Sequence, residues 1–326
     1  MDFHFANNQP LTWSGPAEKA KGNVAAIQLA RQLVAESRPA NPEELTSLSR
    51  YVGWGHTEVL NYALDKLDLL KLLTEDEWDA VKASTLNAHY TALPVIAAIW
   101  RGFERLGAGK LDSLNVLDPS AGVGHFKSMM PESLRDKASW VEVELDKITA
   151  QILTALHPKS KVFGAGYEDV NLPRGHFDII TSNVPFGNYP VAFDGLPRHM
   201  RTSIHDFFFA RSLELLRPGG VMAFITSRYT LDKKDDLVRK HLAEHCDLLA
   251  AVRLPNNAFT SNAGTEVVTD LLFLRKRFAP NKEQPAWANV RQQTLQHHER
   301  DWAAEKFWVN QYYLNHPECV LGKPAA

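Results

Sequence analysis

From about Asn115 onward, short apolar runs alternate with segments whose apolar residues recur at helical spacing. This alternation predicts an α/β fold: a Rossmann-like, doubly wound, mostly parallel sheet covered by helices. Helices are expected between most of the strands, for example over residues 147–156, 204–216 and 234–245. The seven expected strands span residues 115–118, 140–144, 161–163, 177–181, 221–226, 248–254 and 269–275.

Residues 1–88 contain no strand pattern and are expected to form a helical N-terminal region. Asn41, followed by Pro42 and two glutamates, marks a helix start, because asparagine caps helices and proline suits their first turn. Thr74 and Glu77 have the spacing of a capping box and mark a second start. Residues 89–279 are expected to form the α/β domain, and residues 280–326 a largely irregular C-terminal tail.

Composition narrows the class of protein. The 326 residues are 44% hydrophobic and 23% charged, which is ordinary for a globular chain, and the apolar runs are too short to span a bilayer. No signal peptide is visible, and Cys246 and Cys319 provide neither a disulfide framework nor metal spacing, so a cytoplasmic protein without a metal site is expected. The net charge of -2 means that any surface for nucleic acid must be local, with residues 198–201 and Lys233-Lys234 as candidates.

A loop with two glycines, residues 118–124, follows the first expected strand. In a doubly wound sheet, ligands bind beyond the carboxyl ends of the strands. Gly122 and Gly124 allow the backbone to approach a ligand closely, and the next helix offers unpaired N–H groups. The second strand ends at Glu144, where an acid can accept hydrogen bonds from both ribose hydroxyls of a nucleoside. The alternative is a plain strand-to-helix turn with a surface acid.

The fourth expected strand leads into Ser182-Asn183-Val184-Pro185-Phe186-Gly187. Such a loop can hold a planar amino group, with the side-chain oxygen of Asn183 and the main-chain carbonyl of Val184 as acceptors for its two N–H bonds. These acceptors favour tetrahedral geometry at a nitrogen whose lone pair is delocalised, and they stabilise the charge that develops there. Pro185 favours an extended Val184, and Phe186 offers a face for stacking a base. Beside the glycine loop, this pattern predicts methyl transfer to an exocyclic amine without a strong general base.

With these motifs in this order, the chain resembles class I S-adenosylmethionine-dependent methyltransferases of the N6-adenine DNA type. The order is that of the gamma group, in which a short motif, here His89-Tyr90-Thr91-Ala92-Leu93-Pro94, precedes the glycine loop. The sequence is also similar to the methyltransferase part of phage- and plasmid-borne helicase–methyltransferase proteins. That similarity covers roughly residues 45–322 and rests on residues 51–55, 182–187, 253–259, 263–270 and 316–322.

The resemblance implies S-adenosylmethionine as the cofactor and makes residues 89–279 the methyltransferase domain. Glu144 would bind the ribose and Glu168 the amino group of the cofactor adenine, while Phe259 would pack on the flipped target base. The other cofactor-binding positions implied are Tyr90, Thr91, Asp118, Pro119, Ala121, Gly122, Gly124 and Phe126. The positions implied for catalysis and for holding the target base are Asn183, Val184, Pro185 and Phe186.

Two features depart from the family. Val184 stands where the usual loop has proline; its carbonyl is main chain, so the chemistry survives, but a less rigid loop is expected. Only about 50 residues follow Arg275, where related enzymes usually carry a target-recognition domain. Specificity is therefore expected from the N-terminal helices, from residues 188–203, or from a separate target-recognition or helicase partner.

The sequence thus predicts a site-specific DNA methyltransferase, of a restriction-modification, phage or plasmid system, that transfers a methyl group to N6 of a flipped-out adenine. DNA is the expected partner, and no membrane is involved. Two alternatives remain. The same reaction could act on RNA or on a protein glutamine, or the chain could be a catalytically weak DNA-binding or regulatory module.

Overall fold

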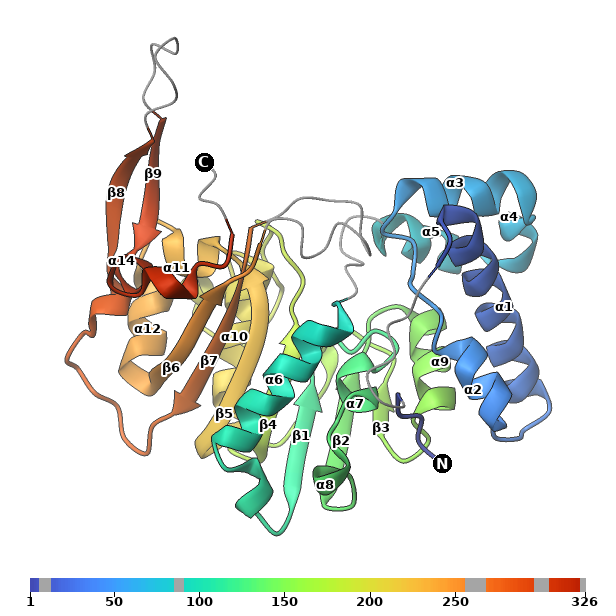
Figure 1. Cartoon of the computed structure of the whole chain (residues 1–326), viewed down its shortest axis with the longest axis horizontal. Helices are drawn as coiled ribbons and strands as arrows, with labels where there is room; N and C mark the ends of the chain where they lie inside the picture. Colours follow the sequence, from blue (N-terminus) through green and yellow to red (C-terminus); the bar gives the residue numbers. More distant parts are fainter. Residues whose placement is uncertain (6–12, 85–90, 256–267, 296–304, 323–326) are drawn as a thin grey trace. The chain divides into compact units, whose positions relative to one another are not determined.

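Seven strands form one sheet in the order β3-β2-β1-β4-β5-β7-β6 (Figure 1). The computed structural model describes residues 1–5, 13–84, 91–255, 268–295 and 305–322. β1, β2 and β3 pair in parallel, whereas β7 lies antiparallel between β5 and β6. This confirms the predicted doubly wound, mostly parallel α/β sheet. The strands are β1 (Leu114–Asp118), β2 (Ala138–Val143), β3 (Lys161–Phe163), β4 (Phe177–Asn183), β5 (Leu216–Ser227), β6 (Cys246–Arg253) and β7 (Thr269–Lys276).

The strands form where continuous apolar runs can be buried on both faces of the sheet. Leu114, Val116 and Leu117 of β1 are all fully buried. All seven predicted strands are present, with ends that differ by a few residues. The largest difference is at β5, which begins at Leu216 rather than at residue 221, so that the preceding helix ends at Leu215.

The chain divides into two compact units, and each is described separately. Of the described residues, unit 1 contains Met1–Leu172 and Thr181–Asn183, while unit 2 contains Pro173–Ile180 and the residues from Val184 onward. The helices of unit 1 are α1 (Pro16–Ala35), α2 (Pro42–Leu48), α3 (Thr57–Lys66), α4 (Leu69–Leu72), α5 (Glu75–Ser84), α6 (Leu93–Arg105), η1 (Ala108–Lys110), α7 (His125–Ser128), α8 (Glu132–Arg135), α9 (Lys147–Leu156) and η2 (Tyr167–Asp169).

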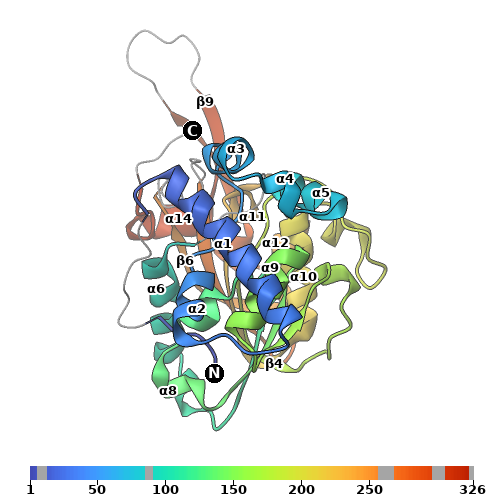
Figure 2. The same ribbon diagram turned by 90° about the vertical axis from the view of Figure 1, so that its right-hand side faces the viewer.

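Helices α1 to α5 confirm the predicted helical N-terminal region. Asn41 caps α2 through hydrogen bonds of 3.0 Å from Glu43 N and Glu44 N, and Glu44 accepts the reciprocal bond from Asn41 N. Thr74 and Glu77 form the second predicted capping box. The apolar face of α1 shares a core with α9 of the sheet layer, as the side view in Figure 2 allows the reader to follow. Trp54 is buried in this core together with Ile148 and Ile152 of α9.

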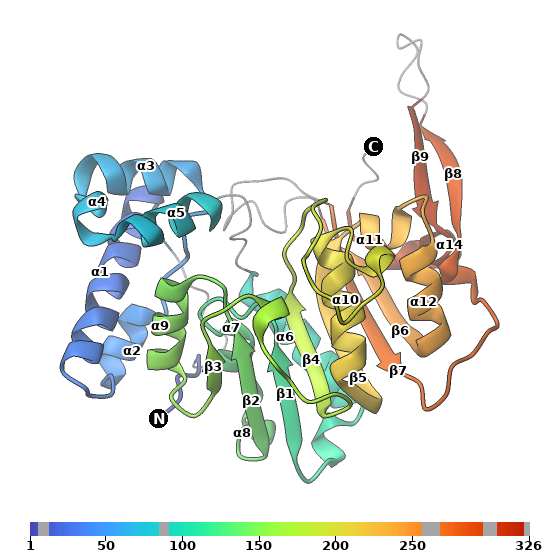
Figure 3. The same ribbon diagram turned by 180° about the vertical axis from the view of Figure 1, so that it is seen from behind.

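In unit 2, α10 packs on β5 and α12 on β6, so that both helices cover one face of these strands (Figure 3). Phe209 of α10 contacts Phe224 of β5 edge to face, with ring centroids 5.1 Å apart. The helices of this unit are η3 (Arg198–Met200), α10 (Ile204–Leu215), α11 (Tyr229–Asp232), α12 (Leu237–His245), η4 (Ala286–Ala288), α14 (Gln311–Asn315) and η5 (Pro317–Cys319). In the part of the chain that the structure describes, no helix is both long enough and apolar enough to cross a membrane.

The C-terminal residues, expected to be largely irregular, contain an antiparallel hairpin instead. Its strands are β8 (Val290–Leu295) and β9 (Glu305–Asn310), which pair only with each other. The sequence of β8, Val-Arg-Gln-Gln-Thr-Leu, has neither the apolar run of a buried strand nor a clear alternation. Backbone pairing with β9 defines this strand, and pairing of that kind cannot be read from local composition.

Candidate cofactor and acceptor site

Asp118 is the last residue of β1, and its side chain is fully buried. Its Oδ1 accepts hydrogen bonds from Ser120 N at 3.2 Å and from the Ser182 hydroxyl at 2.7 Å. Its Oδ2 is also buried but accepts no hydrogen bond from any residue that the structure describes. Burial raises the pKa of Asp118 well above its ordinary value, and the nearby Glu142 and Glu144 carboxyls add to this effect. The free oxygen makes Asp118 suited to a ligand that brings its own donor.

The glycine turn after β1 is fastened to the end of β2. Ala121 N donates to Val143 O at 2.9 Å, and Gly122 N donates to Oε2 of Glu144 at 2.8 Å. Oε1 of Glu144 accepts from Asp146 N at 2.9 Å, so the whole carboxyl group is oriented. A carboxylate has about four lone-pair sites, which leaves acceptor capacity for hydroxyl groups of a ligand. Burial raises the pKa of Glu144 to about 7.

Gly124 has a packing role that sequence reasoning missed. Its φ is +78°, and a Cβ at this position would lie 2.5 Å from Cδ2 of His157 and 2.7 Å from Cδ1 of Leu153. The expected reason for glycine here was close approach of a ligand. The structure adds a second reason, because the ring of His157 occupies the space that a side chain would need. The 33-residue separation of Gly124 and His157 hides this contact from the sequence.

The remaining predicted cofactor positions lie in the same unit. Thr91, just before α6, is buried, and its hydroxyl makes no hydrogen bond to the described residues. Phe126 is buried in α7, and its carbonyl accepts from Trp100 Nε1 at 2.8 Å. Glu168 is partly buried in η2. Pro119 and Ala121 are buried in the glycine turn, whereas Tyr90 and Phe259 lie outside the described residues.

Ser182 connects the two predicted loops within unit 1. It is fully buried in β4, which runs two residues further than expected and ends at Asn183. Its hydroxyl lies 2.7 Å from Oδ1 of Asp118 and 3.4 Å from Ser120 O. The start of the Asn-Val-Pro-Phe loop is therefore bonded to the start of the glycine loop. Sequence reasoning did not assign Ser182; the only signal was a serine at a buried position of an apolar strand.

In unit 2, the loop continues from an anchored Val184. Its side chain is buried, and its N–H donates to Ile225 O of β5 at 3.1 Å. Pro185 and Phe186 follow and are partly buried. Proline has no N–H and could not make the bond to β5. Val184, at the position where the resembling enzymes have proline, thus makes a main-chain hydrogen bond that proline could not make, and the expected loss of rigidity stays a prediction.

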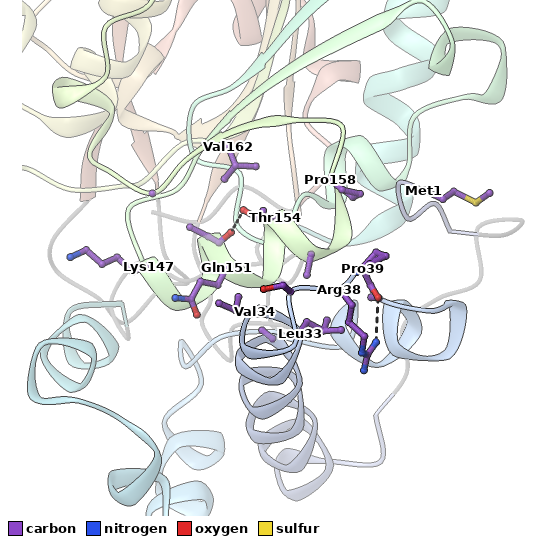
Figure 4. A pocket seen from close by; sticks show the side chains of 16 residues that line it. Met1, Leu33, Val34, Arg38, Pro39, Lys147, Gln151, Thr154, Pro158 and Val162 are labelled. Atoms are coloured by element: carbon purple, nitrogen blue, oxygen red, sulfur yellow. Dashed lines mark hydrogen bonds between the residues drawn. The ribbon is translucent and has the colours of Figure 1, made fainter.

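A cavity of about 640 Å³ lies elsewhere in unit 1 (Figure 4). It opens between the end of α1 with the turn that follows and the outer face of α9. Leu33, Val34, Thr154, Pro158 and Val162 are among its lining residues. None of the predicted cofactor or acceptor residues lines it, so it is distinct from the site described above.

No known family model matches the sequence, and no curated protein matches it. Solved structures do match. One is a protein assigned as the modification subunit of a type I restriction enzyme from Vibrio vulnificus, 19% identical, with a TM-score of 0.50 over 67% of this chain and 49% of that one. A protein assigned as a class I S-adenosylmethionine-dependent methyltransferase from Listeria monocytogenes is 18% identical, with a TM-score of 0.49 over 81% of this chain and 91% of that one.

A type I restriction-modification methyltransferase subunit from Streptococcus thermophilus is 20% identical, with a TM-score of 0.49 over 57% of this chain and 44% of that one. The match with the Vibrio subunit spans about half of that subunit's length. At these identities the likeness concerns the fold. The likeness to the Vibrio subunit is in keeping with the predicted doubly wound, seven-stranded sheet, in which β7 lies antiparallel between β5 and β6.

Proposed function

We propose that this protein is an S-adenosylmethionine-dependent methyltransferase that acts on the N6 amino group of adenine in DNA. The observation that carries the proposal is the 2.7 Å hydrogen bond from Ser182 to Asp118. It joins the residue directly before Asn183 to the turn expected to hold the cofactor. Donor and acceptor groups must be held in one geometry for methyl transfer, and orientation of this kind is a large part of catalysis.

The residues around Asp118 fit the proposed cofactor. The free Oδ2 of Asp118 suits an ammonium group, and the remaining lone pairs of Glu144 suit two ribose hydroxyls. The buried Thr91 hydroxyl has capacity for one more polar contact. When bound, S-adenosylmethionine supplies a methyl group on a positively charged sulfur. Glu168 remains our candidate for the amino group of the cofactor adenine.

On the acceptor side, Asn183 and the carbonyl of Val184 would accept hydrogen bonds from the two N–H groups of the adenine amine. Their partial negative charge favours the positive charge that develops on that nitrogen during transfer. Phe186 would stack on the base, which must leave the DNA helix to reach the loop. The bond from Val184 N to Ile225 O supports this assignment, because it fastens the residue that carries the second acceptor to β5.

DNA is proposed as the substrate because the Asn-Val-Pro-Phe loop resembles that of N6-adenine DNA enzymes. The fold shared with a protein assigned as a type I modification subunit is in keeping with this choice. We also propose that a separate target-recognition or helicase partner supplies part of the specificity.

Purified protein is incubated with methyl-labelled cofactor in separate reactions that contain duplex DNA, single-stranded DNA, RNA or a protein extract. Labelled nucleic acid is digested to nucleosides and labelled protein to amino acids, and mass spectrometry identifies the methylated product. We expect label in DNA as N6-methyladenine. Label confined to RNA or to glutamine would transfer the proposal to those substrates. Cofactor binding without methyl transfer to any fraction would indicate that the protein is a binding module rather than an enzyme.

A further inference from the structure

The β8–β9 hairpin is a two-stranded ribbon that projects from the rest of unit 2 in all three views (Figures 1, 2 and 3). We propose that one face of this ribbon binds duplex DNA beside Val184, Pro185 and Phe186, which we call the acceptor loop, and contributes to target selection. This inference rests on the proposed function, because it takes DNA as the substrate.

The ribbon face is defined by the register of the two strands. Gln292 pairs with Trp308, and Thr294 pairs with Lys306. Directly paired residues of an antiparallel ladder share one face of the sheet. These four side chains therefore line up on one side, where Gln292, Thr294 and Lys306 are exposed and Trp308 is partly exposed. We call this side, together with Lys234, the ribbon face.

Lys234 adds a second positive charge to the ribbon face. Its Nζ lies 5.8 Å from the centroid of the Trp308 ring. Neither Lys234 nor Lys306 forms an ion pair with any residue in the described ranges. The ribbon face thus offers two positive charges, those of Lys234 and Lys306, that no ion pair to the described residues neutralises.

Several other cations of unit 2 are already paired. Lys233, which the sequence suggested as a DNA contact, lies 3.3 Å from Asp206. Arg253 lies between two buried acids, and both Arg275 and Arg277 bind Asp247. Since binding to phosphates depends on cations that are available to the solvent, the two lysines of the ribbon face are better suited to it than these paired groups.

The base of the ribbon is fixed at the end of the sheet where the acceptor loop begins. Asn310 N donates to Oδ1 of Asp232 at 2.8 Å, and Asn310 Nδ2 donates to Leu231 O at 2.9 Å. Both partners belong to α11, which directly follows β5. Val184 N is bonded to Ile225 O near the same end of β5. The ribbon face and the acceptor loop therefore belong to one end of unit 2.

The chemistry of the face fits a DNA groove. A two-stranded ribbon can enter a groove and read bases, as β-ribbon proteins do. Lysines would contact phosphates, the amide of Gln292 can donate to and accept from base edges, and Trp308 offers apolar contact. Six paired residues at about 3.3 Å each give roughly 20 Å of contact, somewhat more than half a turn of DNA.

The test compares two charge reversals on the two faces of the same ribbon. Lys306, changed in Lys306→Glu, lies on the ribbon face. Arg291, changed in Arg291→Glu, pairs with Val309 and is next to Gln292 in β8, so it lies on the opposite face. Binding of a fluorescent DNA duplex is measured by anisotropy across a range of salt concentrations. We expect Lys306→Glu to weaken binding several-fold. The plot of log affinity against log salt concentration should also become less steep, by about 0.9, because one phosphate contact is lost. Arg291→Glu should leave both quantities unchanged.

A third variant, Trp308→Phe, keeps an aromatic ring and should bind better than Trp308→Ala. Thermal unfolding of every variant identifies any loss of affinity that comes from misfolding. Equal effects of the two charge reversals, no effect of either, or tighter binding of single-stranded RNA than of duplex DNA would overturn the inference.

The readouts also separate this inference from the proposed function. If the wild-type protein methylates DNA but Lys306→Glu binds and methylates like the wild type, the ribbon inference fails and the function stands. If Lys306→Glu loses duplex binding while the wild type transfers no methyl group to DNA, the ribbon inference stands and the enzyme assignment fails.

Discussion

The backbone N–H of Gly122 donates a 2.8 Å hydrogen bond to Oε2 of Glu144. The turn after β1 and the acid after β2 are therefore one structural group, although 22 residues separate them. A ligand that contacts one of these residues would therefore lie beside the other. Because burial raises the pKa of Glu144 to about 7, its carboxyl gains or loses a proton within the physiological pH range.

The first prediction concerns pH. Above its pKa Glu144 is ionised and accepts hydrogen bonds, whereas below it the carboxyl carries a proton and loses acceptor capacity. Cofactor affinity measured by calorimetry should therefore rise between pH 6 and pH 8. In Glu144→Gln this rise should shrink and affinity at pH 8 should fall, while Asp112→Asn, at an exposed acid of the same unit, should behave like the wild type. An unchanged pH profile in Glu144→Gln would remove Glu144 from the cofactor site.

The second prediction concerns Asp118. Asp118→Ala removes the buried carboxyl whose Oδ2 is free for a ligand. A hydrogen bond to a charged group contributes about 1.5–3 kcal/mol, so we expect cofactor affinity to fall roughly ten- to a hundredfold. Calorimetry gives the affinity, and thermal unfolding checks that the fold is intact. A folded variant that binds the cofactor as tightly as the wild type would contradict the assignment.

The third prediction concerns Asn183. Asn183→Ala removes the side-chain acceptor for the target amine and leaves the bond between Ser182 and Asp118 in place. Loss of one such electrostatic group costs about 10²–10³ in turnover, and we expect at least that loss. Cofactor affinity should not change. Asn171→Ala, at an exposed asparagine of the same unit, is the matched control. Equal turnover in the two variants would exclude Asn183 from the chemistry.

The fourth prediction concerns Gly124. Gly124→Ala forces a side chain into the space of His157 and Leu153, and overpacking of this kind costs about 1–3 kcal/mol beyond the strain of a positive φ. Gly107→Ala is the control, because its φ is also positive, +96°, and the nearest atom to an added Cβ is Lys110 Cδ at 3.8 Å. Urea unfolding should show the larger loss for Gly124→Ala. Similar losses would mean that backbone strain alone explains the glycine.

The sheet could be predicted because its strands are continuous apolar runs. β3 was expected at its observed bounds, and Asn41 and Thr74 cap helices as their patterns indicate. These features depend on neighbours within a few residues. Strand ends were less certain: β5 begins at Leu216, although its pairing with β7 starts only at Val221, so local composition did not indicate the first residues of this strand.

The contacts that organise the candidate site could not be predicted in the same way. Ser182 and Asp118 are 64 residues apart, and their hydrogen bond depends on how two strands come together. The ring of His157 beside Gly124 is a second such case. Motifs identified which loops carry polar groups, but only the folded chain reveals which of those groups bind one another and which retain acceptor capacity.

The hydrogen bond from Val184 to Ile225 has a consequence for engineering. Replacing the valine with proline would give the loop that is usual in the methyltransferases that the sequence resembles. It would also remove the backbone N–H at this position and leave the Ile225 carbonyl without this donor. The valine at position 184 and the neighbouring strand β5 are therefore matched, and a change to one should be accompanied by a change to the other.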